Sequence, residues 1–547
     1  MKLKAPPPGP PFAPTAPNLF RYVREAHGER EFLAFGEQRL SYADADRLSA
    51  ELAKGLLALG LGKGARVGIL MPNNPDWVIV WMACARIGAL SVLLSTFYQG
   101  PEIAWAVRHN DLHALIIADR YLHNDYVERL ERALAGLAEE TSTELFLPEQ
   151  PHLRHIVVWG ACEKPWAIRG QTDLLARAAA KPRLDDRILA GVEANITPSD
   201  LLLTICTSGS TAEPKAVVHT HGVALRATFQ FLDYINIKPD DRTYTAQPFF
   251  WVGGLNINLL PTMYLGACMC FSETPDPADI IAMARREGVT RFTGWPAQAQ
   301  RLRQALAEGG EGLTKLRAGL GEPLDELGRP IPPERRSSGL MGMTESFGMH
   351  SIDRAGPTPL GKGGSWGRKL PGMERLIVDP ETGAPLATGE RGELFIRGHN
   401  MMHGYYRKER WEVFTAEGYF PTGDLSILDE DDYIYFVGRK GEMIKTSGAN
   451  VAPPEVENAL LTCPGVREAI VFGVPDATKG EVVAAVVSPQ DGAALDAEGL
   501  RLALRERLSP YKVPQTFAFL THDEIPRTAS GKAIKPKLRE MLFPAGT

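Results

Sequence analysis

The segment from Leu201 to Lys215 reads LLLTICTSGSTAEPK, an apolar run followed at once by a loop of small hydroxyl residues. The run from Leu201 to Cys206 is continuous rather than alternating, which is typical of a parallel strand covered on both faces. Similar runs occur at Ala114 to Ala118 and at His155 to Trp159, with helical patterns between them. Strands that alternate with helices predict an α/β fold built on doubly wound, layered sheets.

The first part of the chain repeats this pattern. We expect a helix from Asp44 to Leu59, a strand from Arg66 to Met71 and a helix beginning near Pro75. The most apolar stretch, Val78 to Leu94, contains Arg86. It therefore predicts a buried helix that leads into a strand, and no membrane span.

After Asp424 the pattern changes to turn residues and short alternating strands, as at Tyr433 to Val437. Further along we expect two helices and two strands, at Pro454 to Leu461, Ala469 to Val474, Glu481 to Val487 and Asp496 to Leu508. The boundary is predicted after residue 438. We expect residues 1–438 to form a large domain with a small β-barrel-like part, and residues 439–547 to form a small α+β domain.

Composition excludes several classes of protein. The 547 residues are 44% hydrophobic and 23% charged, as in a folded protein of more than one domain. The net charge of −6 makes nucleic acid an unexpected partner. The six cysteines lack C-x-x-C spacing, and the proline-rich start lacks the apolar core of a signal peptide, so we expect reduced thiols in a cytoplasmic protein. The oligomeric state stays open, with a homodimer as one alternative.

The loop after the first strand has the chemistry of a phosphate site. Hydroxyl groups and unhindered backbone N–H groups follow one another, and Pro214 stiffens the turn that presents Lys215. The Walker pattern G-x-x-x-x-G-K-S/T is absent. These residues predict polyphosphate binding through Thr207, Ser208, Gly209, Ser210, Thr211 and Lys215.

With this loop, nearly the whole chain resembles the adenylate-forming superfamily of acyl-CoA synthetases, aryl-CoA ligases, luciferases and peptide-synthetase adenylation domains. The segment Met341-Gly342-Met343-Thr344-Glu345 resembles the motif whose threonine and glutamate meet the α-phosphate and magnesium. The resemblance therefore implies ATP bound by the loop and this motif, with Mg²⁺ at Thr207 and Glu345. A carboxylate is a hard oxygen ligand of the kind that Mg²⁺ takes.

Later segments match the family in order. Asp424, in YFPTGD, is implied to accept hydrogen bonds from both ribose hydroxyls. Arg439, in GRKG, is implied to reach the ribose as well, and Gly441 to act as a hinge. Lys445 and Gly448 are implied to approach the thiol cofactor and the adenylate. Lys532, in PRTASGK, is implied to be the catalytic lysine.

The resemblance implies a two-step reaction. A carboxylate attacks the α-phosphorus of ATP to give an acyl-adenylate and pyrophosphate, and the thiol of coenzyme A then displaces AMP. The small domain is expected to reorient between the steps, so that Lys532 serves only the first. Thr344, Glu345 and Lys532 are the implied catalytic residues.

The acid pocket is expected to begin in QPFFWVGG, residues 247–254. Amino-acid-activating relatives place an aspartate in this stretch, whereas here Phe250 and Trp251 stand, and a buried ammonium group without a partner is costly. With Gly253 and Gly254 beside them, they favour a bulky apolar acid, either fatty, aryl or cyclic. Phe249 is equally compatible with a purely structural core.

Several positions depart from the family. Ala212 and Ala216 stand where relatives usually have glycine, and Met341 replaces an aromatic residue expected to stack on adenine. In Gly321-Glu322-Pro323, the acid Glu322 replaces alanine. Two alternatives to the CoA ligase follow: an enzyme that loads the phosphopantetheine of a carrier protein, and a catalytically silent homologue that binds acyl groups.

Overall fold

The computed structural model describes residues 9–207, 215–294, 296–309, 312–320, 329, 331–337, 339–353, 356–446, 449–476, 479–505, 507–508, 512–528 and 531–543. The chain divides into two compact units. The first comprises Met1–Gly363, Lys369–Met373 and Gly398–Phe414, and the second comprises Gly364–Arg368, Glu374–Arg397 and Thr415–Thr547.

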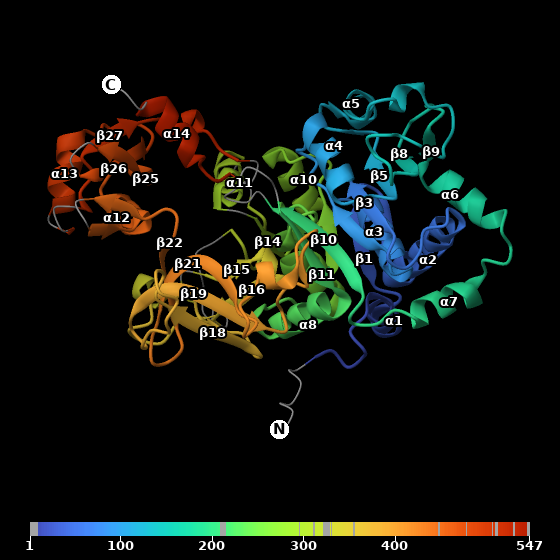
Figure 1. Cartoon of the computed structure of the whole chain (residues 1–547), viewed down its shortest axis with the longest axis horizontal. Coiled ribbons are helices and arrows are strands. Elements are labelled where there is room, and N and C mark those ends of the chain that lie inside the picture. Colours follow the sequence, from blue (N-terminus) through green and yellow to red (C-terminus); the bar gives the residue numbers. More distant parts are fainter. Residues whose placement is uncertain are drawn as a thin grey trace. The chain divides into compact units, whose positions relative to one another are not determined.

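The first unit contains an eight-stranded sheet (Figure 1). Its central strands are parallel, while β11 and β20 add antiparallel strands at one edge. In spatial order the strands are β20 (Gly404–Tyr405), β11 (Lys215–Thr220), β10 (Leu201–Thr207), β4 (Leu90–Leu93), β3 (Arg66–Leu70), β5 (Ala114–Ala118), β8 (His155–Trp159) and β9 (Ala167–Arg169).

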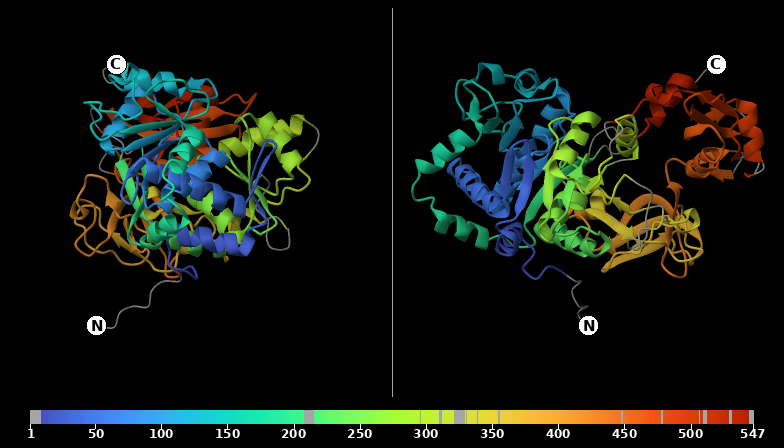
Figure 2. Two further views of the ribbon diagram at one scale, coloured as in Figure 1. Left: turned by 90° about the vertical axis from the view of Figure 1, so that its right-hand side faces the viewer. Right: turned by 180° about the vertical axis from the view of Figure 1, so that it is seen from behind.

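A second, five-stranded sheet lies in the same unit. Three of its strand pairs are parallel, and β1 pairs with β13 although the two are far apart in the sequence (Figure 2). In spatial order the strands are β14 (Arg291–Thr293), β12 (Arg242–Thr245), β13 (Cys268–Phe271), β1 (Glu31–Phe35) and β2 (Gln38–Ser41). Two smaller sheets complete the strands of this unit. One pairs β6 (Arg120–Tyr121) with β7 (Asn124–Asp125), and the other has the order β15 (Met341–Met343), β16 (Gly348–Ile352) and β17 (Arg368–Lys369).

Helices cover these sheets. They are α1 (Ala16–His27), α2 (Tyr42–Ala58), α3 (Pro75–Arg86), α4 (Gly100–His109), α5 (Tyr126–Ala133), α6 (Gly170–Ala179), α7 (Asp186–Ala194), α8 (His221–Phe231), α9 (Leu260–Leu265), α10 (Pro277–Glu287) and α11 (Pro296–Glu308). A π-helix, η3 (Gly253–Leu259), runs directly into α9. Short 3-10 turns are η1 (Leu137–Glu139), η2 (Leu232–Tyr234), η4 (Pro333–Arg335), η5 (Thr344–Ser346) and η6 (Arg410–Glu412).

Helix α3 shows how the sequence builds the core. Asn74 caps its N-terminus by accepting from the backbone N–H of Trp77 at 2.8 Å, and proline occupies the first turn. Every residue of α3 except Asp76 is buried, and the helix contacts strands of both sheets. The buried charge of Arg86 is neutralised by ion pairs with two carboxylates, those of Asp46 and Glu193. This confirms the buried helix that leads into strand β4.

The second unit contains two sheets. The first has the strands β18 (Met373–Val378), β19 (Arg391–Gly398), β21 (Phe420–Leu428) and β22 (Ile434–Arg439). The second has β24 (Ala449–Val451), β23 (Ile444–Thr446), β26 (Gly480–Pro489), β25 (Val466–Asp476) and β27 (Thr516–Phe519). Its helices are α12 (Pro453–Leu461), α13 (Ala497–Arg505), α14 (Lys535–Leu542) and the turn η8 (His522–Glu524), and β17 (Arg368–Lys369) lies where the chain passes between the units.

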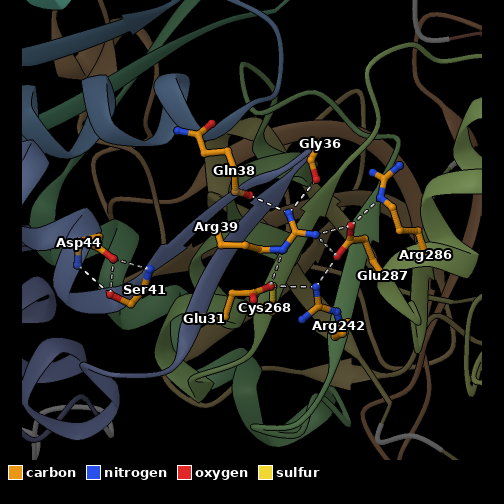
Figure 3. Close-up of polar contacts among 10 residues, drawn as sticks. All are labelled: Glu31, Gly36, Gln38, Arg39, Ser41, Asp44, Arg242, Cys268, Arg286 and Glu287. Carbon is orange, nitrogen blue, oxygen red and sulfur yellow. Dashed lines mark hydrogen bonds and ion pairs between the residues drawn. The ribbon is translucent and has the colours of Figure 1, made fainter.

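A cluster of charged side chains ties the five-stranded sheet together at one edge (Figure 3). The carboxylate of Glu287, whose side chain is 3% exposed, accepts from Arg39 at 2.8 Å, Arg242 at 2.7 Å and Arg286 at 3.0 Å. Arg242 also pairs with Glu31 at 2.9 Å. Since Glu31 and Arg242 begin parallel strands, the cluster marks the edge at which those strands start.

The predicted fold class is confirmed, with layered α/β sheets and an α+β C-terminal part. The bounds of β5 and β8 agree with the prediction, and those of α2 and α12 differ by one or two residues. All six cysteines are free thiols. Within the described ranges, every helix is too short or too polar to cross a membrane. The boundary after residue 438 stays a prediction, because the second unit also takes in residues before it.

Candidate active site

The turn that carries Thr344 and Glu345 is held at three backbone carbonyls by residues from three different segments of the chain. His219 of β11 donates from Nε2 to the Thr344 carbonyl at 2.8 Å. The N–H of Met402 donates to the Glu345 carbonyl at 2.7 Å. Asn256 of η3 donates from Nδ2 to the carbonyl of Phe347. The position of the turn is therefore fixed from three sides.

His219 is suited to that structural task. It is completely buried, and burial lowers its pKa to about 3. The ring is therefore neutral at ordinary pH, and because a carbonyl only accepts, the proton sits on Nε2. Its ring also packs edge-on against Phe347, with the centroids 4.9 Å apart.

The side chain of Glu345 lies within a chain of contacts that leads to Lys215. The hydroxyl of Tyr405 donates to Glu345 Oε1 at 2.8 Å. Burial raises the pKa of Tyr405 far above its usual range, so that hydroxyl keeps its proton. The ammonium group of Lys215 lies 5.2 Å from the centre of the same ring. Tyr405 thus joins the predicted magnesium ligand to the predicted phosphate-binding lysine.

Thr207 and Lys215 frame the predicted phosphate loop. They are register partners at the ends of β10 and β11, and the Thr207 hydroxyl lies 3.4 Å from the Lys215 carbonyl. Ala216 continues the regular strand without a positive φ, so the absence of glycine there is harmless. The loop residues between them lie outside the described residues, and these are Ser208, Gly209, Ser210, Thr211 and Ala212.

The segment before Thr344 forms strand β15. Met341 is buried at 7% exposure, and a Cβ added at Gly342 would lie 2.3 Å from the Gly348 carbonyl oxygen. Glycine at 342 is therefore required by the close approach of β16. Met343 belongs to the same strand. Gly321, Glu322 and Pro323, predicted to border the nucleotide, lie outside the described residues.

The residues around Glu345 fit a magnesium ion that is bound mainly by phosphates. One carboxylate oxygen accepts from Tyr405, which leaves the other for a metal. Mg²⁺ on nucleotides commonly takes one or two carboxylates and keeps phosphate and water oxygens as its remaining ligands. Among the described residues no group of three acidic, histidine or cysteine side chains forms a complete cage. Glu345 and Thr207 are thus compatible with a site that the nucleotide completes.

The predicted acid pocket is an aromatic cluster. Phe250 and Trp251 pack edge-on with centroids 5.3 Å apart, and the ring of Phe97 lies 6.0 Å from each of them. Phe250 is buried, whereas Phe97 is 48% exposed. A Cβ at Gly254 would lie 2.1 Å from the Pro248 carbonyl oxygen, so glycine lets η3 pack directly on this segment. Phe249 is fully buried in the main core, in agreement with its structural alternative.

Asp424 and Arg439 form one ion pair in the second unit. They are register partners on β21 and β22, and Arg439 Nε lies 2.8 Å from Asp424 Oδ1. The hydroxyl of Thr422 accepts from the Asp424 N–H at 3.0 Å, which fixes the backbone before it. Two residues with the same predicted partner, the ribose, thus lie side by side.

The predicted hinge has a charged neighbour. Lys440 pairs with the buried Glu393 at 2.7 Å, and its N–H donates to the Gly423 carbonyl at 2.8 Å. Gly441 is exposed, and an added Cβ would meet nothing within 4 Å. A salt bridge therefore exists one residue before the glycine at 441. Of the residues predicted near the thiol, Lys445 lies on β23 and Gly448 lies outside the described residues.

The backbone around Lys532 is a closed turn. Thr528 donates its N–H to the Lys532 carbonyl at 2.8 Å, and Arg527 donates to the Gly531 carbonyl at 3.0 Å. Arg527 is itself paired with Glu468 at 2.6 Å. The side chain of Lys532 is exposed, and none of the described residues forms an ion pair with its ammonium group. The lysine is thus presented by a braced loop.

Sequence reasoning missed four residues that build this site: Tyr405, His219, Phe97 and Asn256. His219 had a detectable signal, because Lys215, Val217 and His219 alternate on one face of a strand. The others had none, since each contact joins segments that are far apart in the sequence.

Comparison with known proteins agrees with this site. The family model described as AMP-binding enzyme matches residues 20–406, and that of the AMP-binding enzyme C-terminal domain matches residues 455–532. The chain is 31% identical to a feruloyl-CoA synthase of Amycolatopsis, covering 92% of this chain and 94% of that protein. It is 30% identical to an indoleacetate–CoA ligase of Aromatoleum aromaticum, covering 93% and 94%.

A solved structure supports the same conclusion. ATP-bound MatB from Rhodopseudomonas palustris is 25% identical and superposes with a TM-score of 0.78, covering 97% of this chain and 99% of MatB. With a family model matching more than two thirds of its length, the chain belongs to the family of AMP-binding enzymes, within the adenylate-forming superfamily.

Proposed function

We propose that this chain, an AMP-forming acyl-CoA synthetase, activates an aromatic carboxylic acid. The observation that carries the proposal is the cluster of Phe97, Phe250 and Trp251, whose centroids lie 5.3–6.0 Å apart. Aromatic rings favour edge-on and offset packing at such distances, so a flat aryl acid suits these three faces. The names of two relatives, which act on ferulate and indoleacetate, support the same class.

We propose the following roles for the nucleotide-binding residues. We assign Thr344, Glu345, Thr207 and Lys215 to the phosphates, and Asp424 with Arg439 to the ribose. Magnesium held by Glu345 and Thr207 would neutralise the charge that gathers on the α-phosphoryl oxygens. Through its 2.8 Å hydrogen bond, Tyr405 would hold the Glu345 carboxylate in the orientation needed to bind the magnesium ion.

A panel of carboxylic acids tests the substrate class. We expect ferulate and other aryl acids to give acyl-CoA, detected by mass, at higher kcat/KM than fatty or steroid-like acids. Trp251→Ala should raise the KM for the aryl acid about tenfold, because one face of the pocket is lost. A parental protein that prefers fatty acids, or a Trp251 variant with unchanged KM for every acid, would contradict an aryl pocket.

Two assays of the reaction test the alternatives, a silent homologue and an enzyme that loads a carrier protein. Acid-dependent exchange of pyrophosphate into ATP distinguishes an active enzyme from a silent homologue, and the braced Lys532 loop with the Asp424–Arg439 pair supports activity. Supplying either coenzyme A or a carrier protein then identifies the acceptor. The CoA ligases among its relatives support coenzyme A.

A hinge at residue 441 predicts a selective defect. Gly441→Pro should leave acyl-adenylate formation within about twofold of the parent and slow thioester formation roughly tenfold or more, because proline fixes φ where the backbone has to change. The two half-reactions are measured separately, by pyrophosphate exchange and by supplying pre-formed acyl-adenylate with CoA.

Gly441→Ala is the matched control, since an added Cβ there meets nothing within 4 Å. We expect it to retain both half-reactions. Equal losses in the two steps for the proline variant would count against a hinge at this position, and would point instead to a general defect in folding.

We also propose that the domain boundary follows residue 438, that the protein is cytoplasmic and that it forms a homodimer. Six free thiols support a reducing compartment. Light scattering measures the oligomeric state directly.

A further inference from the structure

We propose that Asn256 is a positioning residue that couples occupancy of the acid pocket to the Thr344–Glu345 turn. The inference rests on the proposed function, because it takes Phe250 to Gly254 as the acid pocket. Asn256 lies on η3, the π-helix that begins at Gly253, immediately after the aromatic cluster. Its amide therefore reaches from the pocket wall to the nucleotide motif.

The contacts of Asn256 leave its side chain one orientation. The residue is 1% exposed. Its Nδ2 donates to the Phe347 carbonyl, and its Oδ1 accepts from the Thr228 hydroxyl at 2.7 Å. A Cβ at Gly348 would lie 2.3 Å from Asn256 Nδ2, so the turn approaches this amide as closely as glycine allows. Movement of the amide would be transmitted directly to residues 347 and 348.

The turn that receives this hydrogen bond is strained. Phe347 has a φ of +48°, a left-handed conformation that is uncommon for a bulky side chain. Such a conformation persists only where its surroundings over-determine it, and here the Asn256 bond is one of three that do so. Loss of that bond would let the turn relax, and Glu345 with it.

The helix on the pocket side is suited to respond. π-Helical turns are rare in proteins, and those that occur are frequently found at functional sites. The first residues of η3 pack tightly on the Pro248 carbonyl, since a Cβ added at Gly254 would lie only 2.1 Å from its oxygen. An acid seated against Phe250 and Trp251 would therefore press on the start of the same helix that carries Asn256.

Binding linkage tests the coupling without relying on turnover. The affinity of α,β-methylene-ATP with Mg²⁺ is measured by calorimetry with and without saturating ferulate, or the panel acid of highest turnover. We expect the acid to tighten analogue binding in the parent by roughly 5–150-fold, the usual range of coupling. Asn256→Asp should reduce that factor to about one, because a carboxylate oxygen replaces the donor to Phe347.

Asn258 offers a matched control on the same helix. It is 4% exposed, and it donates to Gln247 Oε1 at 3.1 Å and to the Gly253 carbonyl at 2.9 Å, both on the pocket side. Asn258→Asp should weaken acid binding but retain the coupling factor. Thr228→Val removes the support of Asn256 and touches neither site, so it should lower the factor partially even if Asn256→Asp folds poorly.

Two results would overturn the inference: a parent without linkage between acid and analogue, or Asn256→Asp and Thr228→Val variants with the parental coupling factor. The proposed function fails in a different way, namely if the parent forms no acyl-CoA from any aryl acid of the panel. The two failures are therefore distinguishable.

Discussion

Replacing Lys532 by alanine is expected to lower the rate of acyl-adenylate formation by roughly 10²–10³-fold, the usual loss for one contact to developing charge. Thioester formation from pre-formed acyl-adenylate should be unchanged. The reason is that only the first step joins an anionic carboxylate to a phosphoryl group whose oxygens gain charge, where an ammonium group stabilises both partners. Acid-dependent pyrophosphate exchange measures the first step.

The loop itself should survive this substitution. The bonds that close it do not involve the Lys532 side chain, because the Thr528 N–H donates to the Lys532 carbonyl and the Arg527 guanidinium donates to the Gly531 carbonyl. Lys537→Ala is the control, since it removes the same charge from an exposed position five residues further on. Parental exchange by the Lys532 variant, or an equal loss in the Lys537 variant, would show that another group performs this role.

The parallel strands could be predicted because they carry a local signal. The residues of β5 and β8 are continuous apolar runs between turn residues. Such a run is the pattern expected of a strand that is buried on both faces, so the sequence alone identifies it. Predicted and observed helix ends differ by a residue or two because several neighbouring residues can cap a helix. Helix α2, for example, is capped by Ser41 and so begins before the predicted start at Asp44.

The candidate site was predictable only as separate motifs. Strand β20 is two residues long, so neither its pairing with β11 nor the Tyr405 contact to Glu345 has a local signal. The π-helix η3 likewise could not be predicted, because no hydrophobic pattern in the sequence distinguishes it from an α-helix. These features arise from tertiary packing between distant segments of the first unit, and that packing positions Lys215 and the Met341–Glu345 motif.

The hinge is a further case. Gly441 has no side chain that could form a salt bridge at the predicted hinge, whereas the preceding residue, Lys440, pairs with Glu393 of β19. The register of β19, β21 and β22 brings these charges together across a sheet, and no spacing in the sequence specifies it. With residue 440 anchored in this way, the proposed hinge would concentrate backbone rotation at Gly441.

Removal of the Glu287 carboxylate is expected to cause the largest loss of stability. Glu287→Ala breaks the contacts with Arg39, Arg242 and Arg286 and leaves those guanidinium groups crowded at the sheet edge (Figure 3). Breaking a buried ion pair typically costs about 3–5 kcal/mol. We expect the lower end of this range, because Arg39 and Arg242 are 35% and 26% exposed and water screens part of their repulsion.

The position of Glu287 strengthens this expectation. It is the last residue of α10, where the helix dipole disfavours a negative charge, so its burial depends on the arginines around it. Glu287→Gln keeps the volume and loses the charge, and it should recover part of the stability by accepting one hydrogen bond. Glu25→Ala, an exposed glutamate of α1, should change the free energy of unfolding by less than about 0.5 kcal/mol.

Stability and activity should separate in this variant. The cluster lies where β1 and β12 begin, whereas the aromatic segment at Gln247 to Gly254 follows the end of β12, at the opposite edge of the parallel sheet. Ligands of such sheets bind beyond the carboxyl ends of the strands. Urea unfolding followed by tryptophan fluorescence should therefore show an earlier first transition, while KM for the acid at low temperature stays parental. An unchanged unfolding midpoint would mean that Glu31 and water satisfy the arginines without Glu287.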